Sequence, residues 1–339
     1  MQALEKAAHG QGHVRLTERD APVPGPGQAL LEVCAAGVCG TDLHIVEDTY
    51  SSRPPVTMGH EVSGIVRSVG PGVDTAWIGA RVSCETFIST CGACPWCRDG
   101  RPNLCPSRRS IGSGADGGFA AFLVVSSSQM HQVPDHLDEH AGALCEPLAC
   151  VCQALCDPSV VVAGDDVVVM GPGTMGLLAA QVARACGGTV LITGTDRDEV
   201  RLAKAGELGF AVALASDRPA MTALGGGFGP HVVVECSGAE KAMATGLDVV
   251  RRGGRYVQIG QTADSVSVPL ALVSFKEISI TGGFASTPQS WSRAMALLDK
   301  RLVQLEPLVS EIVPLKDWER VFADTSHGRG VKYVFDPRR

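Results

Sequence analysis

Four cysteines lie within one short stretch of the chain, and their spacing is typical of a metal site. They are Cys91, Cys94, Cys97 and Cys105, separated by two, two and seven residues. Thiolates at such spacing can wrap a single ion, and four of them saturate a tetrahedral zinc and leave no open position for a substrate. Glycine and proline within the stretch suit the tight turns that this requires. We therefore predict a structural zinc site in the lobe 91–105.

Disulfide bonds are the alternative use of these thiols, and the whole sequence argues against them. The chain holds 13 cysteines in 339 residues, which is an odd number. Its first residues lack the basic flank and apolar core of a secretory signal, and no run approaches the roughly 18 apolar residues of a membrane span. We therefore expect a cytoplasmic protein, in which clustered thiols bind metal or take part in catalysis.

A glycine-rich turn supplies a second chemical signature. The segment 171–176 reads G-P-G-T-M-G and lies between an apolar strand-like run and a helical stretch. In the G-x-G-x-x-G pattern the first glycine permits a tight turn, the second lets a pyrophosphate approach the backbone, and the third lets helix and strand pack closely. The phosphates then lie at the positive end of the helix. The predicted cofactor-binding residues of this turn are Gly171, Gly173, Thr174, Met175 and Gly176.

An acidic residue after the next strand indicates which nicotinamide cofactor is used. Asp196 stands 20 residues beyond Gly176, where a carboxylate can accept hydrogen bonds from the adenosine ribose. It would repel a 2′-phosphate, so the sequence favours NAD over NADP, although Arg197 could flank such a phosphate. Arg201 is predicted to reach the ribose or a phosphate, with a solvated helix charge as the alternative.

The chain that must position these groups shows two kinds of residue pattern. Residues 1–153 contain short strand-like runs broken by glycine and proline, such as Gln28–Val33 and Glu61–Val66, which predict a β-rich domain. Residues 154–288 alternate nearly continuous Val/Ile/Leu runs with helical stretches, and residues 289–339 return to the mixed texture. Such alternation predicts a parallel, doubly wound sheet. The predicted fold class is therefore α/β, with a dinucleotide-binding sheet beside a β-rich domain.

Six strands would make a full dinucleotide-binding sheet, and the region 154–288 supplies six candidates. The predicted strands are Asp166–Met170, Val190–Thr193, Ala211–Leu214, His231–Glu235, Tyr256–Ile259 and Ile278–Thr281. The predicted helices in and after this region are Thr174–Cys186, Val200–Leu208 and Trp291–Asp299.

Bulk composition argues against one common use of cysteine clusters, which is to grip DNA. The formal net charge is -7, so bulk electrostatics disfavour nucleic acid. Apolar residues make up 45% of the chain and aromatic residues only 5%, which predicts ample aliphatic cores. We expect neither a nucleic-acid partner nor a membrane partner.

Further motifs occur in the order of a known family. They are G-V-C-G-T-D-L-H at 37–44, G-H-E-V-S-G at 59–64 and E-P-L-A at 146–149, together with the cysteine lobe and the glycine turn. With them the chain resembles, over nearly its entire length, the zinc-dependent medium-chain dehydrogenases, the superfamily of alcohol, sorbitol and threonine dehydrogenases. The resemblance implies a GroES-like catalytic domain that is formed by both ends of the chain.

The resemblance also implies a second zinc ion, at the catalytic site. It implies that Cys39 and His60 bind this zinc and that Glu61 and Glu146 supply or exchange the remaining protein coordination. Alcohol dehydrogenases place a cysteine as the third ligand, whereas E-P-L-A looks like the sorbitol and threonine branch. Cys145 and Cys150 flank Glu146 in the sequence, so a thiolate from one of them is an alternative ligand.

A proton must leave the substrate hydroxyl, and the resemblance places a relay for it. Thr41 and His44 occupy the family's relay positions; a hydroxyl can pass a proton, and histidine titrates near neutral pH. Asp42 is expected to orient a zinc-bound histidine, with a turn or cap role as the alternative.

The expected activity is oxidation of a secondary alcohol, such as a polyol, sugar alcohol, cyclitol or hydroxy amino acid, to the ketone with NAD and two zinc ions per chain. The resemblance implies a homodimer or homotetramer. The alternatives are a dehydrogenase for simple alcohols or aldehydes, a zinc-free NADPH-dependent reductase, and a non-enzymatic nucleotide sensor. The aromatic residues that line the substrate site or merely pack are Tyr50, Phe284 and Trp291.

Overall fold

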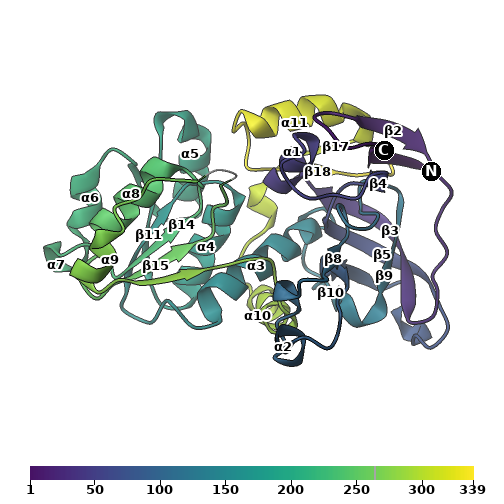
Figure 1. Ribbon diagram of the computed structural model, residues 1–339, viewed down its shortest axis with the longest axis horizontal. Coiled ribbons are helices and arrows are strands. Elements are labelled where there is room, and N and C mark those ends of the chain that lie inside the picture. The colour runs from purple at the N-terminus through teal and green to yellow at the C-terminus, as the bar shows by residue number, and fades with distance from the viewer. Residues whose placement is uncertain (263–264) are drawn as a thin grey trace. The chain divides into compact units, whose positions relative to one another are not determined.

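The computed structural model describes residues 1–262 and 265–339, and its contacts divide the chain into two compact units. The first unit contains Met1–Glu146, Ser286–Met295 and Leu305–Arg339, and the second contains Pro147–Ala285 and Ala296–Gln304. The sequence patterns predict boundaries after residues 153 and 288. Both divisions return the C-terminal segment to the first unit, where Figure 1 shows it in yellow beside the N-terminal strands.

The first unit is built mainly from short strands. Its strands are β1 (Gln2–Lys6), β2 (Val14–Glu18), β3 (Gln28–Gly37), β4 (Val56–Thr57), β5 (Glu61–Val69), β6 (Arg81–Cys84), β7 (Phe87–Ser89), β8 (Arg109–Ser110), β9 (Phe122–Ser126), β10 (Met130–Gln132), β17 (Val309–Val313) and β18 (Lys332–Phe335). Its helices are α1 (Gly40–Val46), α2 (Pro95–Arg98) and α11 (Trp318–Ser326). The largest sheet has the order β10-β6-β5-β3-β18-β17, with β9 also paired to β3.

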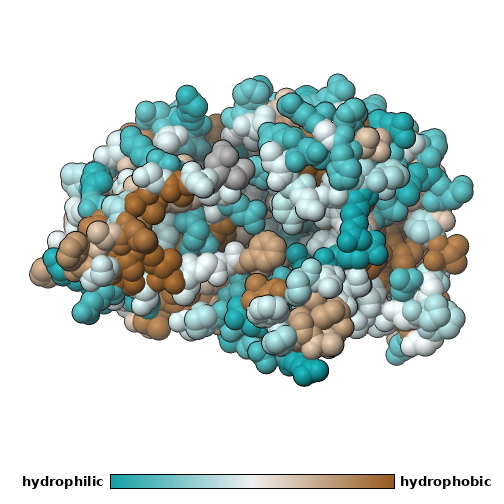
Figure 2. Space-filling model, in the orientation of Figure 1, coloured by the Kyte–Doolittle hydropathy of each residue, from teal (hydrophilic) through white to brown (hydrophobic). Residues whose placement is uncertain are grey.

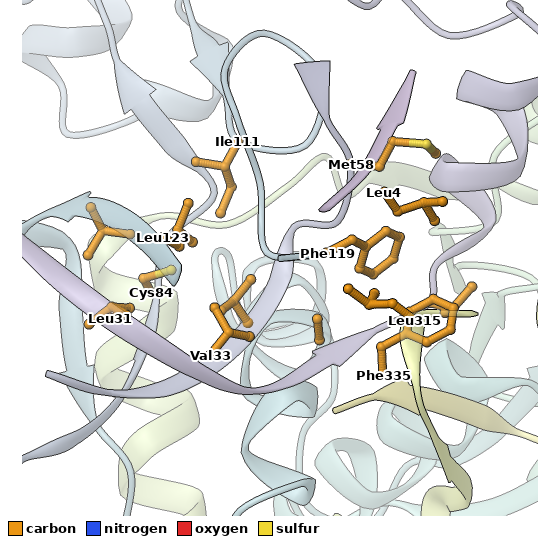
Figure 3. Packing of buried hydrophobic residues seen from close by; sticks show 14 of the residues in the cluster. Leu4, Leu31, Val33, Met58, Cys84, Ile111, Phe119, Leu123, Leu315 and Phe335 are labelled. Atoms are coloured by element: carbon orange, nitrogen blue, oxygen red, sulfur yellow. The ribbon is translucent and has the colours of Figure 1, made fainter. Parts of the chain in front are cut away.

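The core of the first unit forms around Phe119, which is fully buried. Its ring meets the ring of Phe335 edge to face, with centroids 5.0 Å apart, and Figure 3 shows both rings among Leu4, Met58 and Leu315. Residues from the two ends of the chain therefore share one core. Because apolar burial stabilises by about 25 cal/mol per Å², the C-terminal strands are part of this unit's folding.

The second unit is one parallel sheet with helices around it (Figure 1). Its strands are β11 (Asp166–Met170), β12 (Thr189–Gly194), β13 (Ala211–Leu214), β14 (Val232–Glu235), β15 (Arg255–Gln258) and β16 (Ser279–Gly282). Its helices are α4 (Thr174–Ala185), α5 (Glu199–Glu207), α6 (Arg218–Thr222), α7 (Leu224–Gly227), α8 (Glu240–Val249) and α9 (Ala271–Lys276). Helices α3 (Cys145–Cys156) and α10 (Pro288–Asp299) each contribute to both units.

The strand order β13-β12-β11-β14-β15-β16 is that of a doubly wound dinucleotide-binding sheet, so the predicted fold class is confirmed. Every predicted strand is present, with ends shifted by one residue at most in each case. The central strand β14 is buried throughout, as a strand covered on both faces should be, whereas the edge strands β13 and β16 are largely exposed.

None of the helices in the described residues is both long enough and apolar enough to cross a lipid bilayer.

A buried ionic cluster holds the C-terminus of the chain to the first unit. Asp336 is 3% exposed and accepts hydrogen bonds from Arg338 at 2.8 Å, and it lies 3.0 Å from Nε2 of His140. Arg338 also donates to Glu139 at 2.9 Å. Glu139, His140 and Asp336 have the ligand types of a metal site, but the guanidinium already supplies their positive charge.

This cluster makes the stability of the protein depend on acid. Burial by itself raises the pKa of Asp336, but the hydrogen bonds from Arg338 and His140 outweigh burial and lower the pKa from 3.8 to about 2. The stabilisation is therefore complete above pH 3.8 and is lost as the pH falls toward 2. It amounts to about 2 kcal/mol.

We expect the difference in unfolding free energy between the wild type and Asp336→Asn to shrink over this pH range. Urea unfolding of both proteins at pH 6 and pH 3 measures it, and the comparison cancels the other carboxylates. A difference that is independent of pH would contradict the assignment.

Candidate active site and metal centres

The four lobe cysteines converge in the structure. Their sulfur atoms all lie within 4.8 Å of one another, and Sγ of Cys91 lies 3.6 Å from Sγ of Cys105 and 4.0 Å from Sγ of Cys97. A tetrahedral zinc with Zn–S bonds of about 2.3 Å requires sulfur–sulfur edges of about 3.8 Å. The four sulfur atoms therefore fit a zinc ion. The cysteines that the spacing predicted as its ligands are the ones that the structure brings together.

Backbone amides favour a thiolate at Cys91 in this lobe. The amide of Cys94 donates to Sγ of Cys91 at 3.3 Å, and the amide of Cys91 donates to Sγ of Cys105 at 3.4 Å. The amides of Ala93 and Cys94 lower the pKa of Cys91 from 9.0 to about 6. A thiolate at neutral pH is the form that binds metal.

We expect Cys97→Ser to destabilise the protein, because an opened site loses the folding contribution of its ion. The melting temperature should fall by about 5 °C or more, measured by circular dichroism. The control is Ser107→Ala, an exposed position just beyond the lobe. Chelator-treated wild type that melts like untreated protein would contradict a structural ion.

Strand pairing explains how Cys39 and His60 meet although 20 residues separate them. Strand β3 ends at Gly37 and β5 begins at Glu61, and these two residues are paired in the antiparallel ladder. Cys39 follows β3 and caps helix α1, while His60 directly precedes β5. The ligand atoms of Cys39, His60 and Glu61 consequently lie within 4.8 Å of one another.

Two glycines make room for this group. A Cβ at Gly37 would overlap the carboxylate of Glu61, and a Cβ at Gly59 would overlap the ring of Phe119. Gly59 also has a φ of +88°, in the region that side chains rarely adopt. The residues that flank the candidate ligands are therefore constrained by packing as well as by backbone conformation.

The environment of His60 fits a metal ligand. Asp42 is fully buried, and one of its oxygens, Oδ2, accepts from the amide of Cys39 at 2.9 Å. The other, Oδ1, has no hydrogen-bond partner among the described residues and lies 3.7 Å from Nδ1 of His60. A histidine that binds zinc through one nitrogen commonly donates its other N–H to a carboxylate. The unpartnered oxygen is therefore placed where a bound ion would need it.

Burial alone would lower the pKa of His60. Its contacts with Asp42 and Cys39 outweigh burial and raise the pKa well above its ordinary value in the metal-free protein. Metal binding must therefore displace a proton, which couples affinity to pH.

A buried lysine that no sequence motif predicts holds Glu61. Nζ of Lys332 lies 2.8 Å and 2.7 Å from the two oxygens of Glu61 and also donates to the carbonyl of Val38 at 2.9 Å. The Lys332 side chain is 4% exposed. Strand β18 brings it there by pairing with the end of β3. The only sequence signal is a lysine that opens an otherwise apolar strand, and its partner is 271 positions away.

The remaining predicted residues of the first unit lie at different distances from this group. Oγ1 of Thr41 is 3.7 Å from Sγ of Cys39. His44 is half-exposed, one turn along α1, and its Nδ1 lies 3.4 Å from the hydroxyl of Thr49. Glu146 is buried at the start of α3, and among the described residues its carboxylate lies outside the 4.8 Å group. Its role as a ligand stays a prediction.

Cys145, one of the cysteines beside Glu146, is fully buried, and burial raises its pKa to about 12. A thiol must lose its proton to bind a metal, so coordination by Cys145 would release a proton.

The three aromatic candidates for the substrate site differ in position. Trp291 is fully buried and stacks on His131, with ring centroids 4.6 Å apart, so it packs within the first unit. Tyr50 packs against the core of that unit, whereas Phe284 is 42% exposed. Trp96, in the cysteine lobe, is also exposed.

The glycine turn in the second unit has the geometry that dinucleotide binding needs. It joins β11 to α4, and Gly171 has a φ of +98°. A Cβ at Gly176 would overlap the carbonyl of Gly171, so the helix can approach the turn only without a side chain there. Thr174 and Met175 form the first turn of α4.

A pocket of about 310 Å³ opens beside this turn, at the carboxyl ends of the strands. Asp196 lines it directly after β12, as predicted. Asp198 also lines it, but its carboxylate accepts from the amide and the hydroxyl of Thr195 at 2.9 Å and 2.7 Å. Arg201 lies 3.7 Å from Asp198. Lys241 also lines the pocket.

A tetrathiolate lobe, a cysteine–histidine group and a doubly wound sheet with a glycine turn together define a zinc- and dinucleotide-binding oxidoreductase. Family models agree: residues 25–135 match the alcohol dehydrogenase GroES-like domain and residues 174–300 match the zinc-binding dehydrogenase model. The chain belongs to the zinc-binding dehydrogenase family, and it is an enzyme of the polyol-dehydrogenase-like branch.

Characterised relatives match the chain from end to end. It is 39% identical to a sorbitol dehydrogenase of Halalkalibacterium halodurans over 99% of both chains. It is 31% identical to a D-arabitol-phosphate dehydrogenase of Enterococcus avium, covering 99% of this chain and 97% of the relative. A zinc-binding dehydrogenase from Sinorhizobium meliloti 1021, solved with NADP, superposes with a TM-score of 0.90 at 32% identity over 99% of both chains.

Proposed function

We propose that the protein oxidises a secondary alcohol, in the class of polyols, sugar alcohols, cyclitols or hydroxy amino acids, to the ketone with NAD. The observation that carries this proposal is the group formed by Cys39 and His60, with the unpartnered carboxylate oxygen of Asp42 behind it. The similarity to a sorbitol and an arabitol-phosphate dehydrogenase supports the substrate class.

Cys39 and His60 would hold the catalytic zinc, with Glu61 and Glu146 completing or exchanging its coordination. When bound, zinc supplies a Lewis acid that lowers the pKa of a substrate hydroxyl, and the nicotinamide supplies the hydride acceptor. Asp42 orients the imidazole of His60 through Nδ1. Lys332 holds the buried side chain of Glu61 in place, because both carboxylate oxygens lie within 2.8 Å of its ammonium group.

The proton of the hydroxyl needs a route to solvent, and we assign it to Thr41 and His44. Thr41 lies beside the candidate zinc ligand Cys39, and its hydroxyl can both accept and donate. His44 follows on the same helix face and is exposed enough to exchange a proton with water.

The choice of NAD over NADP rests on Asp196. The carboxylate of Asp198 accepts hydrogen bonds from Thr195 and so caps its own turn. Asp196 is therefore the acidic residue of the pocket that we assign to the ribose hydroxyls. Lys241, which also lines the pocket, carries the opposite charge. The initial rate with NAD should exceed the rate with NADP at equal concentration.

We further propose a homo-oligomer in the cytoplasm. Strand β16 is an edge of the sheet, and apolar side chains are exposed on and near it: Leu270 at 66%, Phe275 at 73% and Ile280 at 44%. Figure 2 shows brown, apolar atoms gathered over the end of this unit that carries α9. Such an edge and patch commonly pair with a second copy. Sedimentation that finds only monomer at micromolar concentration would contradict this proposal.

The test of the activity is NAD reduction, followed at 340 nm, across a panel of polyols, cyclitols, hydroxy amino acids and simple primary alcohols. The proposal expects a secondary alcohol with neighbouring hydroxyl or amino groups to have the highest kcat/KM. A preference for simple primary alcohols would favour the rival dehydrogenase. Protein that binds zinc and NADH but oxidises nothing in the panel would favour a sensor.

A further inference from the structure

A buried carboxylate ends the central strand β14, at the edge of the sheet where the pocket opens. Glu235 is fully buried. The hydrogen bonds that the structure gives it come from neutral groups rather than from a cation. A buried carboxyl group is costly unless it is paired or hydrogen-bonded, and the hydrogen bonds to Glu235 offset that cost.

The donors to Glu235 come from the loop that follows β14 and from the last residue of β15. Oε1 accepts from the amide of Ser237 at 2.8 Å and from the Ser237 hydroxyl. Oε2 accepts from the amide of Gly238 at 3.1 Å and from Nε2 of Gln258 at 2.8 Å. One carboxylate thus fixes the turn 236–238 and ties it to the end of β15.

The turn that Glu235 holds is packed against the phosphate-binding glycines. A Cβ built on Gly171 would lie 3.0 Å from the amide nitrogen and from Cβ of Ser237. The amide of Cys236 donates to the carbonyl of Met170 at 2.9 Å, directly before Gly171. Ser237 itself lines the pocket. A movement of Ser237 would therefore change the shape of the glycine turn and the pocket together.

The loop that follows β15 packs closely against the turn 236–238. A Cβ at Gly260 would overlap the amide of Gly238, and a Cβ at Gly238 would overlap the carbonyl of Gln261. Nε2 of Gln258 also donates to the carbonyl of Gly260 at 2.7 Å. The two loops touch backbone to backbone, and Glu235 is the side chain that joins them.

We propose that Glu235 is a positioning residue for the dinucleotide: it holds Ser237 and its turn against the glycine motif in the conformation that the cofactor needs. This inference rests on the proposed function, because it assumes that the pocket binds a nicotinamide dinucleotide. Loss of the carboxylate leaves buried donors without an acceptor, which in a low-dielectric site is costly enough to make the turn relax.

The experiment compares Glu235→Ala and Glu235→Gln with the wild type and with Asp165→Asn. Asp165 is a matched control: it is also a buried carboxylate of this unit, and it accepts from Arg255 at 2.7 Å and from the amide of Val162 at 2.8 Å. It lies at the amino end of the sheet, beside the start of β11. The Kd for NADH and for NADPH is measured by fluorescence titration, and the melting temperature is recorded for each protein.

Glu235→Ala is expected to raise the Kd for the preferred dinucleotide about tenfold or more, with the KM for alcohol and the kcat at saturating dinucleotide changed less than about threefold. Glu235→Gln should raise it less, because the amide oxygen keeps one acceptor for Ser237. Asp165→Asn should lower the melting temperature and leave the Kd unchanged.

Two outcomes overturn the inference. In the first, either Glu235 variant folds and binds the dinucleotide as tightly as the wild type. In the second, Asp165→Asn raises the Kd as much as Glu235→Gln does, which would reduce the effect to general destabilisation. Wild-type protein that binds neither NADH nor NADPH would instead refute the proposed function itself.

Discussion

Replacing Cys39 by serine is expected to abolish alcohol oxidation, with kcat reduced on the order of 10³-fold or more. Serine keeps the size of the side chain but does not ionise at neutral pH, so it is a poor zinc ligand. The helix cap should persist, because Asp42 bonds the backbone amide of residue 39 and not its side chain. Steady-state rates with the best alcohol of the panel measure the effect.

The control for this change is Cys34→Ser. Cys34 is fully buried on strand β3, and burial raises its pKa to about 11, so it is a packing residue on the same element. Cys34→Ser should keep its turnover, and both variants should bind NADH like the wild type. Near-normal activity in Cys39→Ser would remove the catalytic-metal assignment.

Replacing Lys332 by methionine is expected to be strongly destabilising. The change leaves the carboxylate of Glu61 buried without its cation, and breaking a buried ion pair on one side costs about 3–5 kcal/mol. Opposite charge from Glu61 and Cys39 outweighs burial and raises the pKa of Lys332, so the wild-type ammonium stays charged at all pH values of interest. Urea unfolding of protein without the ion at Cys39 and His60 measures the loss, because a zinc ion bound there would give Glu61 a second cation.

The double variant Lys332→Met with Glu61→Gln separates charge from packing. It removes both charges at once and should recover most of the lost stability. A Lys332→Met protein that is destabilised by less than about 1 kcal/mol would show that Glu61 finds another partner, and the assignment of Lys332 as its holder would be wrong.

Local patterns were sufficient to predict the second unit from sequence. Strands such as Val232–Glu235 read as continuous apolar runs because both of their faces are covered. The glycine turn needs its residues for conformational reasons that act within six positions, so its spacing is visible in the chain. The position of Asp196 is also set locally. It follows the end of a parallel strand, and the carboxyl ends of these strands line the pocket.

Long-range contacts, by contrast, could not be predicted from the residues alone. Cys39 and His60 meet only because β3 pairs with β5 in one register, and no local pattern specifies that register. The resemblance to a family supplied the pair; it did not supply Lys332, whose strand arrives from the other end of the chain. The sequence left undecided whether Trp291 lines the substrate site or packs in the core. In the structure its indole N–H donates to Ser286 inside the first unit.

The central claim is that an ion held by Cys39 and His60 is separate from the ion in the cysteine lobe. Elemental analysis of active, extensively dialysed enzyme tests it most directly. We predict two zinc ions per chain in the wild type and one in His60→Ala. The melting temperature of His60→Ala should not show the fall expected when the ion of the cysteine lobe is lost. Fully active wild-type enzyme that carries a single zinc per chain, lost on Cys97→Ser, would contradict the account.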